Sequence, residues 1–76
     1  MKDLLLAIAK KMVDHPDQVQ VQEQHGEWTM VLVLSVAKQD LGKILGKQGK
    51  NIAAIRTIMS AAAAKLHKRV IVEVKE

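Results

Sequence analysis

Apolar residues recur along the chain with two different periods, and each period predicts one kind of secondary structure. Between Leu5 and Val13 they follow the i, i+3, i+4, i+7 spacing that lines one face of a helix. Asp3 suits the first turn of this helix, as a cap or as an acid near the positive end of the helix dipole. Pro16 stops the helix, because proline disfavours helical geometry in the residue before it. The first segment is therefore predicted to be an amphipathic helix.

Two strands are predicted to follow. Valines alternate with glutamines over residues 18–22, which predicts a strand whose valines face inward. After a short turn at residues 25–27, residues 28–36 are almost continuously apolar. Because a strand that is buried on most of both faces has this composition, we place it in the centre of the sheet. Trp28 begins this strand, and we expect it to be a partly buried core anchor rather than a platform for base stacking.

The remaining residues predict two helices and a third strand. Residues 38–45 have the spacing of a short helix, residues 46–49 interrupt it, and a longer helix resumes beyond them. Residues 69–75 alternate between valines and other side chains, as a strand does. The apolar stripe of the longer helix is formed by Ile52, Ile55, Met59, Ala62 and Leu66.

The order of these elements, α-β-β-α-α-β, predicts an α+β fold in a single domain that spans residues 1–76. A right-handed β-α-α-β crossover places its two strands parallel and packs both helices on one face of the sheet. The hairpin adds an antiparallel strand, so we expect a three-stranded mixed sheet. Seventy-six residues are enough for one two-layer domain of this kind, without a second one.

Basic residues are concentrated in one part of the chain. The formal net charge is +4, from 12 basic and 8 acidic residues. Residues 38–69 hold eight of the bases and a single acid, Asp40, so that the rest of the chain is net acidic. Such a separation of charge indicates an anion-binding face better than net charge does. The alternative interpretation is an ordinary solvated helical surface.

Three lysines of this segment flank or occupy the tetrapeptide Gly46-Lys47-Gln48-Gly49, which joins the two predicted helices. Glycines allow backbone conformations closed to other residues and a close approach by a phosphate backbone. The next helix begins just beyond the tetrapeptide, so its free N–H groups and positive dipole end lie at the loop. A G-x-x-G spacing alone is also that of an ordinary turn. Together with the lysines, however, the loop favours a phosphodiester ligand.

The residues around the loop make the pattern more specific. Residues 44–52, Ile-Leu-Gly-Lys-Gln-Gly-Lys-Asn-Ile, resemble the K-homology (KH) signature, in which aliphatic residues flank a G-x-x-G loop between two helices. The order of elements is that of the type II, prokaryotic KH fold, so the resemblance extends over the whole chain. A basic, free-standing KH domain of this size is similar to the KhpA (YlqC) family of small bacterial RNA-binding proteins. Leu45 stands where isoleucine is usual, a change that keeps an apolar side chain.

The resemblance implies a role for particular residues. KH domains hold about four unpaired nucleotides and clamp their backbone with the loop. The clamp would consist of Gly46, Lys47, Gln48 and Gly49. Phosphate contacts would come from Lys43, Lys47 and Lys50. An aliphatic groove for the bases would be supported or lined by Ile44, Leu45, Ile52 and Ile55, of which the last two fit the core equally well. One edge of this groove would be the strand of residues 28–36, and further candidates for RNA contact are Asn51 and Arg56.

We therefore expect a non-catalytic protein that binds short single-stranded RNA segments, as an RNA chaperone or post-transcriptional regulator in the bacterial cytoplasm. The alternative is a small assembly module with secondary RNA binding. Residues 61–64 are all alanine, and Ile58 lies off the apolar stripe, which suits a homodimer through the Ala-rich helix. A helix that packs only on its own sheet is the competing interpretation. The resemblance also implies pairing with a larger KH-containing protein of the KhpB (Jag) type.

Other chemistries lack the residues that they need. The chain has no Cys, which excludes disulfides, thiolate metal sites and a thiol nucleophile, and its three histidines have no ligand spacing. A P-loop needs four residues between its glycines, whereas three separate Gly42 from Gly46. We expect no enzymatic activity, metal, cofactor, targeting segment or membrane span. The single aromatic residue, Trp28, argues against RNA-binding modes that stack bases on rings and is compatible with an aliphatic groove.

Overall fold

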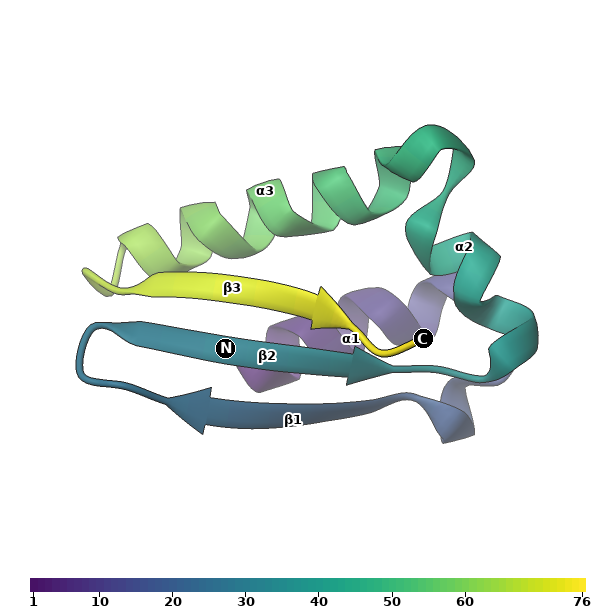
Figure 1. Cartoon of the computed structure of the whole chain (residues 1–76), viewed down its shortest axis with the longest axis horizontal. Coiled ribbons are helices and arrows are strands. Elements are labelled where there is room, and N and C mark those ends of the chain that lie inside the picture. Colours follow the sequence, from purple (N-terminus) through teal and green to yellow (C-terminus); the bar gives the residue numbers. More distant parts are fainter.

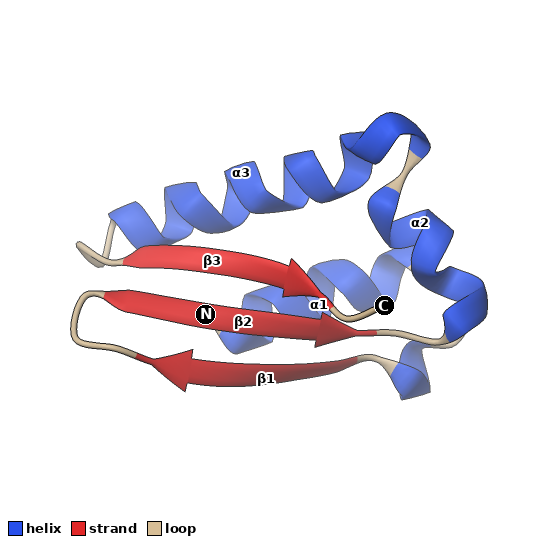
Figure 2. Ribbon diagram, viewed as in Figure 1, coloured by secondary structure: helices blue, strands red, loops and turns tan.

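Three helices and three strands form two layers in the computed structural model, which describes residues 1–76 (Figure 1). Three single turns of 3-10 helix connect or extend the main elements (Figure 2). The helices are α1 (Lys2–Met12), α2 (Leu41–Leu45) and α3 (Lys50–Ala64), and the strands are β1 (Gln20–His25), β2 (Thr29–Ser35) and β3 (Arg69–Val74). The 3-10 turns are Pro16–Gln18, Lys38–Asp40 and Lys47–Gly49. The predicted α+β fold and the order of its elements are confirmed.

The sheet has the strand order β1-β2-β3. β1 pairs with β2 antiparallel, with Gln20 opposite Ser35, and β2 pairs with β3 parallel, with Thr29 opposite Arg69. The central position predicted for β2 is therefore confirmed. The prediction that residues 28–36 form one edge of a binding groove is wrong, because β2 is paired on both sides. The free edge next to α3 belongs to β3.

All core side chains of the sheet lie on one face. In β2, Met30, Leu32 and Leu34 are buried, and the residues between them are half-buried. The expected burial of this strand on most of both faces is thus wrong: its second face carries valines that no helix covers. The helices complete the core from the other side, with Leu5 and Ala9 of α1 among the residues that contribute. The buried positions of α3 are Ile52, Ile55, Met59 and Ala63.

Two predicted stripe residues are absent from that set: Ala62 is half-buried, and the connection from α3 to β3 explains the position of Leu66. The helix ends at Ala64, and His67 has a positive φ of 56° that turns the chain back toward the sheet. The amide N–H of Lys68 donates to the carbonyl of Ala63, which fixes this reversal. Leu66 consequently lies beyond the helix and is 57% exposed, so the stripe predicted to run to this residue ends at Ala63.

Trp28 also lies outside the core, contrary to the prediction of partial burial. Its side chain is 69% exposed at the turn between β1 and β2. Only its backbone is tied to the sheet, since its carbonyl accepts a hydrogen bond from the Arg69 amide at 3.0 Å. The apolar composition of residues 28–36 thus indicated a strand correctly, but the strand begins one residue after the tryptophan.

The first helix matches its prediction except at its ends. Asp3 lies in the first turn as an acid, without a capping hydrogen bond from its side chain. The helix stops at Met12, because Val13 is extended, and Pro16 begins the 3-10 turn that leads to β1. No helix of the structure has the length and apolar character needed to cross a membrane.

Candidate nucleic-acid interface

The backbone at Gly46 determines how α2 is joined to α3. Gly46 has φ 74° and ψ 172°, a region that is essentially restricted to glycine. Its amide donates to the carbonyl of Gly42 at 2.9 Å, which closes α2, and its carbonyl accepts from the amide of Gly49 at 3.1 Å. Lys47 and Gln48 are therefore held in a tight turn with both side chains exposed.

The second half of the loop leaves the start of α3 open. Gln48 and Gly49 are both left-handed, with φ values of 58° and 75°. Lys50 then begins the 15-residue helix α3, and no side chain caps its first N–H groups. No acid occupies the first turn of α3 either. The predicted arrangement of a loop beside a free, positively polarised helix end is thus present in the structure.

Asn51 braces the two helices against each other. Its Nδ2 donates to the carbonyl of Lys43 at 2.8 Å, across the loop from α3 to α2. A Cβ atom added to Gly46 would lie only 2.5 Å from the Cγ of Asn51. Asn51 was a candidate for RNA contact, and the structure gives it a positioning role in the loop. The close contact explains the need for glycine at position 46.

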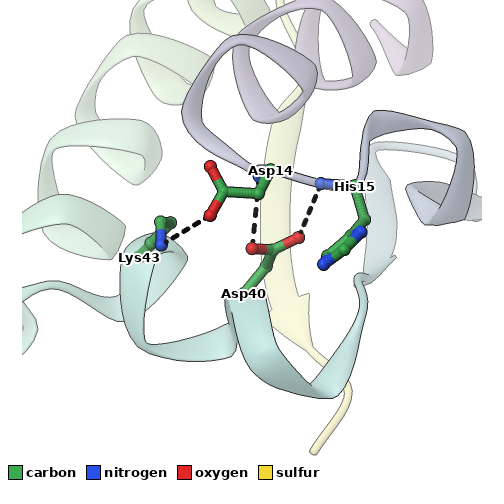
Figure 3. A network of polar contacts seen from close by, with 4 residues as sticks. All are labelled: Asp14, His15, Asp40 and Lys43. Carbon is green, nitrogen blue, oxygen red and sulfur yellow. Dashed lines mark hydrogen bonds and ion pairs between the residues drawn. The ribbon is translucent and has the colours of Figure 1, made fainter.

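The three lysines near the loop differ in their surroundings. Lys47 and Lys50 are exposed and form no ion pair. Lys43, by contrast, lies 3.1 Å from Oδ2 of Asp14, in the segment that follows α1 (Figure 3). Because both partners are substantially exposed, this ion pair is weak and another anion can compete with the carboxylate for the lysine.

Asp40 holds the start of α2 in place, a role that the sequence analysis missed. Its side chain is 1% exposed, and its two oxygens accept hydrogen bonds from the amides of Asp14 at 3.2 Å and His15 at 3.0 Å (Figure 3). The carboxylate therefore ties the segment after α1 to α2. The one signal in the sequence was that Asp40 is the single acid among residues 38–69.

The aliphatic residues of the signature lie beneath the loop. Ile44, Ile52 and Ile55 are buried in the main core, and Leu45 is half-buried against it. Of the two interpretations of Ile52 and Ile55, the structure thus supports the core. These side chains fix the loop to the body of the protein.

A groove of about 380 Å³ runs between α3 and the free edge of β3. The Nε of Arg56 donates to the carbonyl of Val72 at 3.2 Å and so covers part of this edge. The amides of Arg69 and Lys75 donate toward β2, to the carbonyls of Trp28 just before it and of Leu34 within it. Since orientation alternates along a parallel strand, the peptide groups of Val70 and Val72 face the groove. The groove is lined by Arg56, Ser60, Arg69, Val70, Ile71, Val72 and Glu73.

The comparison with protein families identifies this arrangement. A family model described as "KhpA/KhpB, KH domain" matches residues 2–74. The chain belongs to this KhpA/KhpB KH-domain family. Residues 46–49 of this chain have the G-x-x-G spacing and form the turn between α2 and α3.

Individual relatives support the same assignment. The chain is 55% identical to the RNA-binding protein KhpA of Clostridium acetobutylicum over 74 residues, which are 97% of this chain and 99% of that protein. It is 45% identical to proteins of the same name from Chlamydia pneumoniae and Aquifex aeolicus, over 100% of this chain and 97% and 96% of theirs. No solved structure matches the chain significantly.

The geometry of the loop predicts different effects for its two glycines. Gly46→Ala should lower the free energy of unfolding by about 3 kcal/mol, because it combines an unfavourable backbone conformation with the contact to Asn51. Gly49→Ala should lower it by only about 1 kcal/mol, since a Cβ there makes only an ordinary contact of 4.0 Å with Cγ2 of Ile52 and the cost is that of a left-handed residue. Urea unfolding of both variants measures the difference. Equal losses, or a larger loss at position 49, would show that the described contact does not exist.

Proposed function

We propose that the chain binds short single-stranded RNA segments without catalysing a reaction. The loop of residues 46–49 clamps the phosphate backbone, and the groove between α3 and β3 receives the bases. One observation carries the proposal: the uncapped start of α3 lies directly after a glycine loop whose exposed lysines have no acidic partner. That the relatives are named RNA-binding proteins supports it.

The phosphates are bound through backbone and charge together. The left-handed conformations of Gln48 and Gly49 keep the loop clear of side-chain bulk near the first N–H groups of α3. Lys47 and Lys50, both exposed, add two positive charges in the loop and the first turn of α3. Lys43 supplies a third when an RNA phosphate replaces Asp14. Because these contacts are the same for every nucleotide, they position the strand without reading its sequence.

The bases are placed along the free edge of β3. The outward peptide groups of Val70 and Val72 offer donors and acceptors, and Arg56 already uses the carbonyl of Val72. Aliphatic side chains of β3 provide apolar contact beside them. Such a groove selects unpaired bases, because a base in a duplex does not expose its edge to a strand at this depth. A role as an RNA chaperone or post-transcriptional regulator in the bacterial cytoplasm follows from short, weakly sequence-selective sites.

Replacing Lys47 and Gln48 by Asp tests the clamp. The double variant places two negative charges next to the bound phosphates, so its affinity for single-stranded RNA should fall at least tenfold. Both side chains are exposed, so the fold should be retained. Fluorescence anisotropy with a labelled oligonucleotide measures the affinity, and circular dichroism measures the fold.

The matched control changes the net charge by the same amount elsewhere. Lys10 and Gln24 are exposed, and Lys10 lies over β1, the sheet edge opposite to β3. The variant with Lys10→Asp and Gln24→Asp should lose much less affinity than the loop variant. If the two variants bind RNA equally well, the loop is not the clamp.

An assembly role is a second proposal, favoured by an apolar patch on the side of α3 that faces away from the sheet. Ile58 is 48% exposed there, with Ala54 and Ala61 exposed one turn before and after it. Small residues around one large apolar side chain suit a homodimer through α3, or a heterodimer with a KhpB (Jag)-type protein. RNA binding would gain from a dimer, because two clamps can hold one strand.

Ile58→Asp tests this assembly. The wild-type chain should elute as a dimer in size-exclusion chromatography with light scattering, and the variant should be a monomer with unchanged circular dichroism. Gln24→Asp, an exposed residue of β1 away from α3 with the same added charge, is the control and should remain a dimer. A monomeric wild-type chain at all accessible concentrations rules the homodimer out.

A further inference from the structure

The single aromatic side chain of the protein is displayed to solvent. Trp28 is 69% exposed, the largest value among the large apolar residues. It follows the turn between β1 and β2 and contributes nothing to the core cluster. A large ring that is left in water forgoes the stabilisation it would gain by burial, so a ligand that covers it would recover that stabilisation.

The surroundings of Trp28 are basic. Arg69, whose amide donates to the carbonyl of Trp28, follows Lys68 at the start of β3, and Lys65 lies just after α3. The acids at this end are Glu27 and Glu23, so the permanent bases outnumber the acids by three to two. Three permanent cations at the same end of the molecule as an exposed indole are complementary to a nucleic-acid strand, which carries phosphates and bases together.

Trp28 is hydrogen-bonded to a residue that lines the groove which the proposed function assigns to RNA. Arg69 lines that groove and is tied to Trp28 by its backbone. Figure 1 shows the turn before β2 and the start of β3 together at one end of the molecule, with the loop after α2 at the other end. The 15 residues of α3 separate the two ends by about 22 Å, at 1.5 Å per residue.

We propose that Trp28, with Lys68 and Arg69, forms a second RNA contact in which the indole stacks on a base of the same strand that the clamp holds. The inference rests on the proposed function and extends its site. The clamp accommodates about four nucleotides, so a strand must be longer than that to reach Trp28. RNA binding then depends on length, with a step between oligonucleotides that fill the clamp alone and those that span both ends.

Trp28 itself reports on the contact, because the protein has no other aromatic residue. Tetrauridine should bind without changing the tryptophan emission, whereas decauridine should quench it and bind at least fivefold more tightly. Anisotropy of labelled oligonucleotides gives the affinities independently of the protein's own fluorescence.

Variants of the protein separate the contribution of base stacking to RNA affinity from that of overall positive charge. Trp28→Ala should reduce the affinity for decauridine to near that for tetrauridine, while Trp28→Phe retains part of the gain. Lys68→Gln should weaken only the longer oligonucleotide. Lys10→Gln removes the same charge at the opposite sheet edge and should leave the ratio of the two affinities unchanged.

Each outcome decides between the proposals. If decauridine binds no more tightly than tetrauridine and leaves the emission unchanged, the second contact is refuted and the clamp stands. If neither oligonucleotide binds, both proposals fail. If the emission shifts with protein concentration alone and Trp28→Ala abolishes that self-association, the exposed ring is a protein contact, and the RNA proposal is overturned.

Discussion

The rest of the site depends on the backbone conformation of Gly46. Its φ of 74° and ψ of 172° turn the chain sharply enough for α3 to start directly after α2, with only three residues between Gly46 and the new helix. The side-chain amide of Asn51 then bonds across the junction to the carbonyl of Lys43 in α2. The same side chain fills the space that a Cβ at position 46 would need. The loop is therefore short, and its lysines stay next to the free N–H groups of α3.

The turn at Gly46 holds the loop in one conformation because both helices around it are fixed to the core. Ile44 and Ile52 insert into the core on either side of the loop. Asp40 holds the start of α2 through polar contacts, because its buried carboxylate accepts hydrogen bonds from two backbone N–H groups of the segment after α1. An exposed loop thus has buried supports on both sides, and a preorganised loop loses less entropy when a ligand binds.

The sequence predicted those features of the fold that depend on residues close together in the chain. The periods of the apolar residues predicted every helix and strand, and the G-x-x-G spacing located the turn between α2 and α3. The sequence failed to predict features that depend on contacts between residues far apart in the chain. The bonds from the amides of Asp14 and His15 to Asp40 join residues 26 and 25 positions apart, which no spacing rule detects. The free edge of β3 follows from the order in which the strands pair, and the exposure of Trp28 follows from its place at the turn before β2, outside the core cluster.

The central claim is that an unpaired strand is held chiefly through its phosphates, and the salt dependence of binding measures this most directly. The affinity of the unmodified protein for a single-stranded RNA and for a duplex of the same sequence should be determined at 50 and 200 mM salt. With about three phosphate contacts, the affinity for the single strand should fall roughly twentyfold between these concentrations, and the duplex should bind more weakly at both. An affinity that does not change with salt, or a preference for the duplex, would contradict the account.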